Sequence, residues 1–141
     1  MEPSEHDIDI AARTLYGEAR GESNEGLRAV AHVIINRATI DLGNDNKPDW
    51  WGETIAGVCQ KTWQFSCWNA NDPNRQKLID LPTDDSQYIR CRREFVAALD
   101  EPDPTENSTH YHTAAVSPKW AQGKTPTVQI GRHFFYNDVE R

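Results

Sequence analysis

Apolar residues recur at helical spacing through the first part of the chain. Ser4 followed by Asp7 is typical of a helix start, and the apolar positions beyond it predict a first helix over residues 5–19. Ser23 can cap a second helix with two apolar sides, which we therefore expect to be central and mostly buried. The apolar faces comprise Ile8, Ala11, Ala12, Leu15 and Ala19 in the first helix, and Leu27, Val30, Ala31, Ile34 and Ala38 in the second.

The middle of the chain alternates between turn-forming and helical patterns. Residues 43–53 are dense in turn formers and predict a surface loop, and a short helical piece follows at 54–59. Trp50 and Trp51 are costly to leave exposed, so we expect this loop to close over something. Asp84 with Gln87 three residues later matches a capping box, which predicts a third long helix over residues 85–100.

The pattern changes to β-type near the C-terminus. The stretch "THYHTAAV" alternates and is rich in Thr, Tyr and Val, and "TVQIGRHFFYN" contains Gly131, a candidate turn or bulge. We expect these two strands to pair beside the helices. A chain of 141 residues and 16.1 kDa has room for one core. The predicted fold class is α+β, mainly α, with residues 1–141 forming a single domain and a small β element near the C-terminus.

Composition excludes several classes of partner. The net charge is −7, and no cluster of Lys and Arg with interleaved aromatics is present, so we expect no nucleic acid binding. Any anionic ligand must be held by local contacts, because the acidic chain offers no long-range attraction. No stretch approaches the ~18 apolar residues of a membrane span. Three cysteines without a CxxC pair favour reduced thiols, although one bridge stays open.

Glu18 is the strongest candidate for chemistry. It follows Leu15 by three residues, so its carboxyl group falls at the margin of the apolar face, where partial desolvation should raise its pKa. A carboxylic acid that stays protonated near neutral pH suits acid-catalysed cleavage of a glycosidic bond. Gly17 and Gly21 would let a bulky ligand approach the backbone. The alternative is that Glu18 and Glu22 are solvated charges paired with surface arginines.

Glu22 is a poor second catalytic carboxylate. Paired glycosidase carboxylates lie on opposite sides of the scissile bond, whereas two glutamates on one helical turn point the same way. We expect Glu22 to cap or brace the second helix near its positive N-terminal end. A single acid suffices if the nucleophile belongs to the substrate, as when the C6 hydroxyl of muramic acid attacks its own anomeric carbon. A positioned water is the hydrolytic alternative.

Several ordered blocks resemble one family. These blocks are "ARTLYGEARGE", "GLRAVAHVIINRA", "QFS", "HYH" before "SPKWA", and "IGRHFFY". Together they resemble the catalytic domain of the SleB-type cell-wall hydrolases, which includes spore-cortex-lytic enzymes and some phage lysins, over about residues 8–136. The resemblance implies a lysozyme-like, mainly helical fold that acts on peptidoglycan glycan strands. We expect the activity to need no cofactor. We expect the chain to be a monomer.

The resemblance also implies site residues. Glu18 falls on the family's catalytic glutamate, and the candidates for substrate binding are Gln64, Phe65, Ser66, Tyr111, Lys119 and Trp120. The favoured function is lytic transglycosylation, with a hydrolytic muramidase or glucosaminidase as the main alternative. A glycan-binding module without turnover is another. A zinc-dependent amidase using His110 and His112 is a further alternative, but no HExxH is present, so we expect no metal.

Two departures bear on the setting of the protein. The loop at 43–51 is longer than the family pattern leads us to expect. The acidic N-terminus has neither the basic start nor the apolar run of a secretory signal. We therefore expect synthesis in the cytoplasm of a phage-infected bacterium and action on the wall after passage through the membrane by a separate route.

Overall fold

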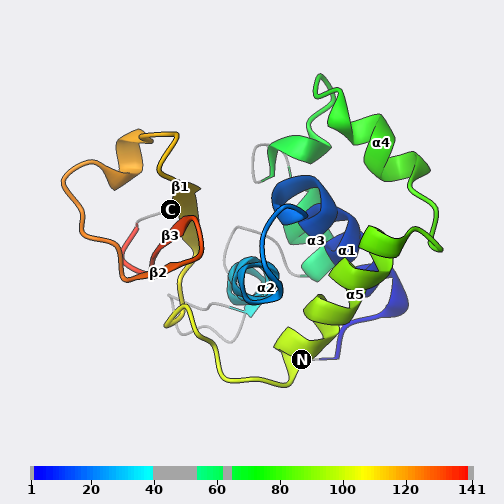
Figure 1. The fold of residues 1–141 in the computed structure, drawn as a ribbon, viewed down its shortest axis with the longest axis horizontal. Helices are drawn as coiled ribbons and strands as arrows, with labels where there is room; N and C mark the ends of the chain where they lie inside the picture. Colours follow the sequence, from blue (N-terminus) through cyan, green and yellow to red (C-terminus); the bar gives the residue numbers. More distant parts are fainter. Residues whose placement is uncertain (1, 40–53, 62–64, 140–141) are drawn as a thin grey trace.

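The helices lie on one side of the molecule and a small sheet on the other (Figure 1). The computed structural model describes residues 2–39, 54–61 and 65–139. The chain order is α1 (Glu5–Ala19), α2 (Asn24–Thr39), α3 (Ile55–Gln60), η1 (Ser66–Trp68), α4 (Asn74–Asp80), α5 (Ser86–Leu99), β1 (His110–Thr113), η2 (Lys119–Ala121), β2 (Val128–Ile130) and β3 (His133–Tyr136). The predicted α+β, mainly helical class with a C-terminal β element is confirmed.

Two of the predicted helix starts are capped as expected. Ser4 and Asp7 form a reciprocal capping box at the start of α1, with both backbone-to-side-chain distances at 3.0 Å. Ser23 accepts a hydrogen bond from Gly26 N at 3.2 Å at the start of α2. The third prediction was wrong by one residue: Asp85, not Asp84, accepts from the backbone N–H groups of the first turn of α5.

The core lies where α1, α2, α3 and α5 pack together. α2 contacts α1, α3 and α5, which confirms its predicted central position. Three apolar residues of the face predicted for the second helix are fully buried, together with a phenylalanine of α5. These are Leu27, Val30, Ile34 and Phe95, each 0% exposed. Among the described residues no helix has both the length and the apolar character that a membrane crossing requires.

The sheet has three strands rather than two. β3 lies between β1 and β2 and is antiparallel to both, with Tyr111 opposite Phe135 and Val128 opposite the same residue. The predicted C-terminal strand is a hairpin, because Gly131 adopts φ +59° and turns the chain between β2 and β3. This turn brings Arg132 and His133 towards the helices.

Two predictions from the sequence concern residues outside the described part of the chain. The loop at 43–51, with Trp50 and Trp51, lies there, and so does Gln64.

Helix α4 was not predicted, because Leu78 is its one buried residue and its other positions carry no apolar periodicity.

Candidate active site

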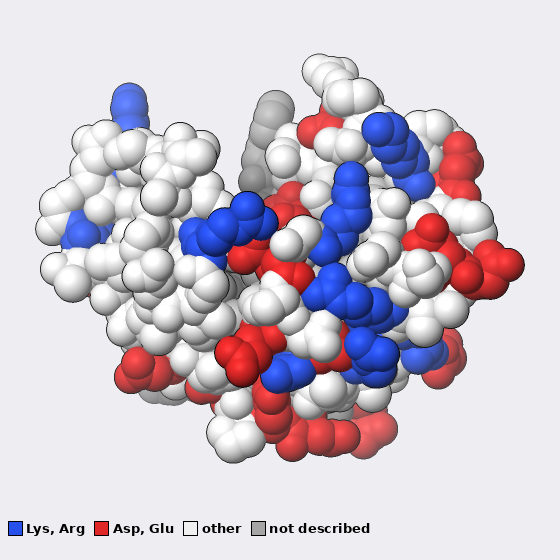
Figure 2. Space-filling model, viewed as in Figure 1, with Lys and Arg blue, Asp and Glu red and all other residues white. Residues whose placement is uncertain are grey.

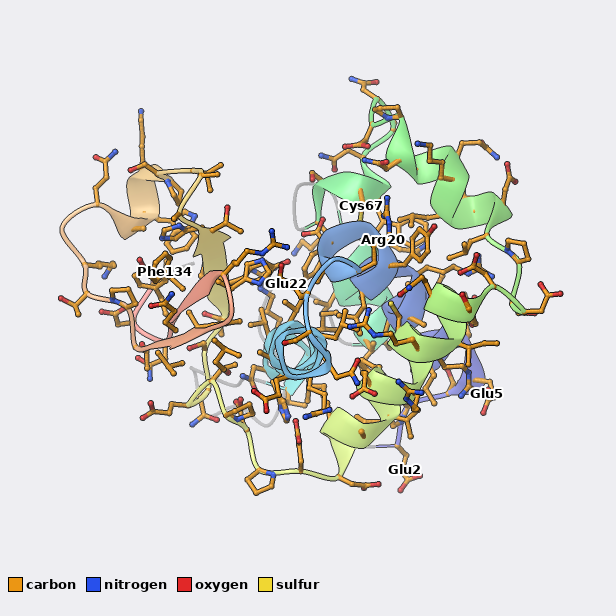
Figure 3. All side chains as sticks on the ribbon, in the orientation of Figure 1. Glu2, Glu5, Arg20, Glu22, Cys67 and Phe134 are labelled. Atoms are coloured by element: carbon orange, nitrogen blue, oxygen red, sulfur yellow. The ribbon has the colours of Figure 1, made fainter. Side chains whose placement is uncertain are left out.

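A cleft of about 750 Å³ separates the C-terminal end of α1 from the sheet. One wall consists of residues 17–22, and the other consists of residues 113–115 and the β2–β3 hairpin. Figure 2 shows the notch between the part that carries the sheet and the helical part. In Figure 3, Phe134 lies on the sheet side, Cys67 and Arg20 on the helical side, and Glu22 between them.

Glu18 lies on the helical wall of this cleft and is partly buried. Its Oε1 accepts a hydrogen bond of 2.9 Å from the hydroxyl of Tyr111, which comes from β1, 93 positions away in the chain. Burial raises the pKa of Glu18 above its ordinary value, in spite of the opposing hydrogen bonds from Tyr111 and Cys67. The structure therefore has the expected carboxyl group with a raised pKa at the margin of the apolar face.

Gly17 lets a second segment approach Glu18. A Cβ at position 17 would lie 2.9 Å from the Cβ of Cys67, so only glycine allows η1 to pack this closely on α1. η1 is held there by Trp68, whose Nε1 donates to Thr14 Oγ1 at 2.8 Å. The packing places the Cys67 thiol against the carboxyl group of Glu18. The predicted role of Gly17, to admit a ligand, is thus accompanied by a structural one.

Arg37 supports the site from beneath. It is buried, its Nε donates to Thr109 O at 2.7 Å, and its guanidinium lies 5.1 Å from the centre of the Phe65 ring. Its positive charge lowers the pKa values of Glu18 and Tyr111 and so partly opposes the effect of burial. Desolvation of the Tyr111 hydroxyl beside Glu18 raises its pKa well above the ordinary value, so the hydroxyl remains a proton donor to the carboxyl group.

Glu22 has a different partner from the one expected. Its carboxylate pairs with Arg132 at the β2–β3 turn, where Arg132 Nε donates to Oε2 at 2.9 Å. It therefore joins the α1–α2 turn to the sheet instead of capping α2. Burial alone would raise the pKa of Glu22, but the Arg132 hydrogen bonds and the charge of His133 hold it below its ordinary value. Glu22 is thus an ionised carboxylate and a poor proton donor.

None of the described residues predicted to bind substrate is among those that line the cleft. Phe65 is 1% exposed and lies in the core beneath Arg37, so direct contact with substrate does not fit its position. Ser66 and Lys119 are exposed, but neither is among the described residues that line the cleft. Tyr111 is the one described member of the predicted binding set that contacts Glu18.

Trp120 packs on the opposite face of the sheet from Tyr111. Its ring centroid lies 5.0 Å from that of His110, 5.7 Å from that of His112 and 5.1 Å from that of Tyr136. Trp120 therefore lies in an outer aromatic cluster and is not among the described residues that line the cleft, and its predicted role in substrate binding stays a prediction. Burial, with the charge of Arg37, lowers the pKa of His110 to about 4. Among the described residues, no three His, Cys, Asp or Glu side chains are arranged to hold a metal ion.

Comparison with known families identifies the family of this chain. The sequence profile of the family described as cell wall hydrolase matches residues 21–136. The chain belongs to the cell wall hydrolase family. The match begins three positions after Glu18 and covers Tyr111 and Arg132.

Relatives of known name support the same family. The chain is 30% identical to a spore cortex-lytic enzyme of Oceanobacillus iheyensis over 140 residues and 29% identical to that of Bacillus subtilis over 141 residues. These alignments cover 94% of this chain but 42% and 38% of the two relatives. The chain thus spans less than half the length of the curated relatives it matches.

Two solved structures have the same fold. The catalytic domain of the Bacillus cereus SleB protein is similar with a TM-score of 0.72 and 28% identity, over 96% of this chain and 92% of that one. The catalytic domain of the germination-specific lytic transglycosylase SleB from Bacillus anthracis gives a TM-score of 0.70 and 29% identity, over 94% and 95%. The resemblance to the SleB-type family found in the sequence is therefore confirmed.

Several residues of the site had no role in the sequence-based interpretation. The residues that contact or surround the two glutamates are Arg20, Arg37, Cys67, Arg132 and His133. Most of them lie inside the blocks that carry the family resemblance, so the blocks themselves were the available signal. What the blocks cannot give is which distant residues meet, and Arg132 meets Glu22 across 110 positions.

Proposed function

We propose that this chain cleaves the glycan strand of peptidoglycan as a lytic transglycosylase, with Glu18 as proton donor and then proton acceptor. The observation that carries the proposal is the Glu18 carboxyl group on the wall of a 750 Å³ cleft, where burial raises its pKa. The family match and the spore cortex-lytic relatives support peptidoglycan as the substrate.

The reaction needs one acid and no water. Glu18 gives its proton to the glycosidic oxygen that leaves the anomeric carbon of muramic acid, and the bond between them breaks. The C6 hydroxyl oxygen of the same muramic residue bonds to that carbon, and its proton passes to the Glu18 carboxylate. The 1,6-anhydro ring closes, and Glu18 is again protonated for the next turnover.

The two neighbours of Glu18 suit this cycle. Tyr111 donates to Oε1, so it fixes the rotamer of the carboxyl group and supports the carboxylate after the proton has left. Glu22 is tied to Arg132 and ionised, so it does not compete as a donor. Glu18 is thus the one carboxyl group with a raised pKa among the described residues that line the cleft, which favours a nucleophile that the substrate supplies.

Product mass tests the proposal directly. Purified sacculi digested with the protein should release muropeptides that end in anhydromuramic acid, each lighter by one water than the reducing-end product. Sacculi digested with a hydrolytic muramidase serve as the control. Free reducing ends would assign the chain to the hydrolases, and the absence of soluble muropeptides would assign it to glycan-binding modules. The phage setting stays a prediction.

Tyr111→Phe should lower turnover and shift its pH dependence. Loss of one hydrogen bond to the carboxyl group corresponds to roughly a tenfold lower rate. Turnover requires protonated Glu18 and therefore falls as the pH rises through the pKa of Glu18. The Tyr111 hydrogen bond opposes the raised pKa, so its removal should move this decline to higher pH.

The control is Tyr16→Phe, which removes a hydroxyl group on the same helix as Glu18 while the ring beneath Arg20 remains. Rate against pH is measured for both variants on the same sacculi. An unchanged rate and pH profile for Tyr111→Phe would show that the hydroxyl neither positions nor tunes Glu18.

A further inference from the structure

The net charge of the groups that line the cleft differs in sign from the net charge of the whole chain. The whole chain carries a net charge of −7, yet the charged side chains that line the cleft are Glu18, Glu22, Arg20 and Arg132. Glu18 is protonated in the acid form of the site and Glu22 is ionised, so these four groups sum to one positive charge. Figure 2 shows basic side chains on both sides of the notch.

Arg20 is held in place with donors to spare. Its guanidinium carbon lies 4.5 Å from the centre of the Tyr16 ring, and its Nη1 donates to Tyr16 O at 2.9 Å. Within the described part of the chain, its Nε and Nη2 groups have no protein acceptor. Arg20 is exposed and lines the cleft two positions after Glu18.

Arg132 is held in the same way on the opposite wall. Its Nε and Nη2 groups bind Glu22, whose side chain is 7% exposed, and Nη2 also lies 3.4 Å from Gly21 O. The Arg132 side chain nevertheless remains 73% exposed, and Nη1 has no acceptor among the described residues. Two guanidinium groups are thus fixed in position at the cleft, each with free N–H groups.

Fixed guanidinium groups with free N–H donors are suited to bind carboxylates. Guanidinium N–H groups bind carboxylates through short, charge-assisted hydrogen bonds, and a fixed guanidinium loses little entropy when it does so. The sugar rings of a glycan strand carry no charge. The carboxylates of peptidoglycan belong to the peptide stem, which is attached through the lactyl group at C3 of muramic acid, on the same sugar ring whose C1 carries the cleaved bond.

We propose that Arg20 and Arg132 form a carboxylate subsite that binds the peptide stem of the muramic acid residue at the cleaved bond. This inference rests on the proposed function, since it names the part of the peptidoglycan that the same cleft recognises. An acidic protein cannot attract an anionic wall over long distances, so the local arginine pair supplies the contact. The subsite makes the stem peptide a determinant of specificity.

The test compares Arg20→Gln with wild type on soluble glycan strands that carry peptide stems. We expect KM to rise about tenfold with kcat unchanged, because a charge-assisted contact to a part of the substrate that does not react is lost. On the same strands with methyl-esterified stem carboxylates, the two proteins should differ by less than about twofold. Wild-type KM on the free-acid strands should also rise with ionic strength.

Arg92→Gln is the matched control, because it removes one positive charge from α5 at a residue whose partner is Glu5 and which does not line the cleft. Equal KM values for wild type and Arg20→Gln on stem-bearing strands would overturn the subsite while leaving glycan cleavage in place. A KM increase that persists on amidase-treated strands would assign Arg20 to the lactyl carboxylate and overturn the stem assignment. Failure of wild type to cleave any strand would contradict the proposed function instead.

Discussion

Glu18→Gln should lower the cleavage of purified peptidoglycan by at least ~10²-fold, the usual scale for a positioned acid or base. Glutamine keeps the size of the side chain and can accept the Tyr111 hydrogen bond through its amide oxygen, but it has no proton to give. The loss should appear in kcat, since binding of the strand does not depend on that proton. Release of soluble muropeptides, measured across pH 4 to 9, checks this result.

The same substitution should not destabilise the fold at neutral pH. Burial raises the pKa of Glu18, so the folded state favours the protonated form. The stability that this group contributes is fully present below the ordinary carboxyl pKa and is lost as the pH rises through the raised value. Neutral glutamine avoids that loss, and Glu18→Gln should therefore melt at or above the temperature of wild type at pH 7, with a difference that shrinks in acid.

Glu25→Gln is the matched control, because Glu25 is exposed in the first turn of α2 and lies outside this cleft. Its activity should equal that of wild type. Glu22→Gln adds a second comparison: it weakens the contact with Arg132 but should retain measurable turnover. Wild-type turnover by Glu18→Gln together with an inactive Glu22→Gln would transfer the acid to Glu22.

The helices could be predicted from the sequence because their stability comes from periodic apolar faces. α1 and α2 each bury the side that the pattern marks, and Ser4 caps α1 through a partner three residues away. Glu18 could be predicted for the same reason, since its burial follows from its position relative to Leu15 on one helix. These features depend on local spacing.

The remainder of the site depends on contacts between distant residues. The Tyr111 hydrogen bond to Glu18 requires that β1 lie beside the end of α1, which no local pattern specifies. The family resemblance implied a binding role for Trp120, but it could not indicate that the ring packs on the opposite face of the sheet from Tyr111. Alternation along β1 indicates that Tyr111 and the flanking histidines face opposite ways, but it does not indicate which face meets the helices.

The partner of Glu22 illustrates the same limit. Its position before α2 predicted a role at the helix N-terminus, where a carboxylate is favourable. Ser23 already caps that helix, however, and the β2–β3 turn at Gly131 brings Arg132 to the carboxylate. A guanidinium partner at hydrogen-bonding distance outweighs the helix dipole, because a direct charge-assisted hydrogen bond is the stronger interaction.

Val30→Asp should destabilise the protein severely, by about 4 kcal/mol or more. Val30 is 0% exposed, in the helix that contacts α1, α3 and α5. An aspartate there must be buried as an unpaired charge or take up a proton, and either outcome adds to the loss of apolar packing. Chemical denaturation at pH 7, compared with wild type, measures the change in the free energy of unfolding.

Ile89→Asp on α5 is the matched control, because it places the same charge on a helix at an apolar residue that is 50% exposed. Its cost should stay below about 1 kcal/mol, since the new carboxylate remains in water. Val30→Ala separates the two contributions at Val30: it leaves a cavity without a charge and should cost roughly 2 kcal/mol. An unfolding transition of Val30→Asp that coincides with wild type would show that α2 is not the centre of the core. The position of Glu18 depends on α1, and α1 packs on α2, so a destabilised α2 should also reduce wall cleavage at temperatures below the melting point of wild type.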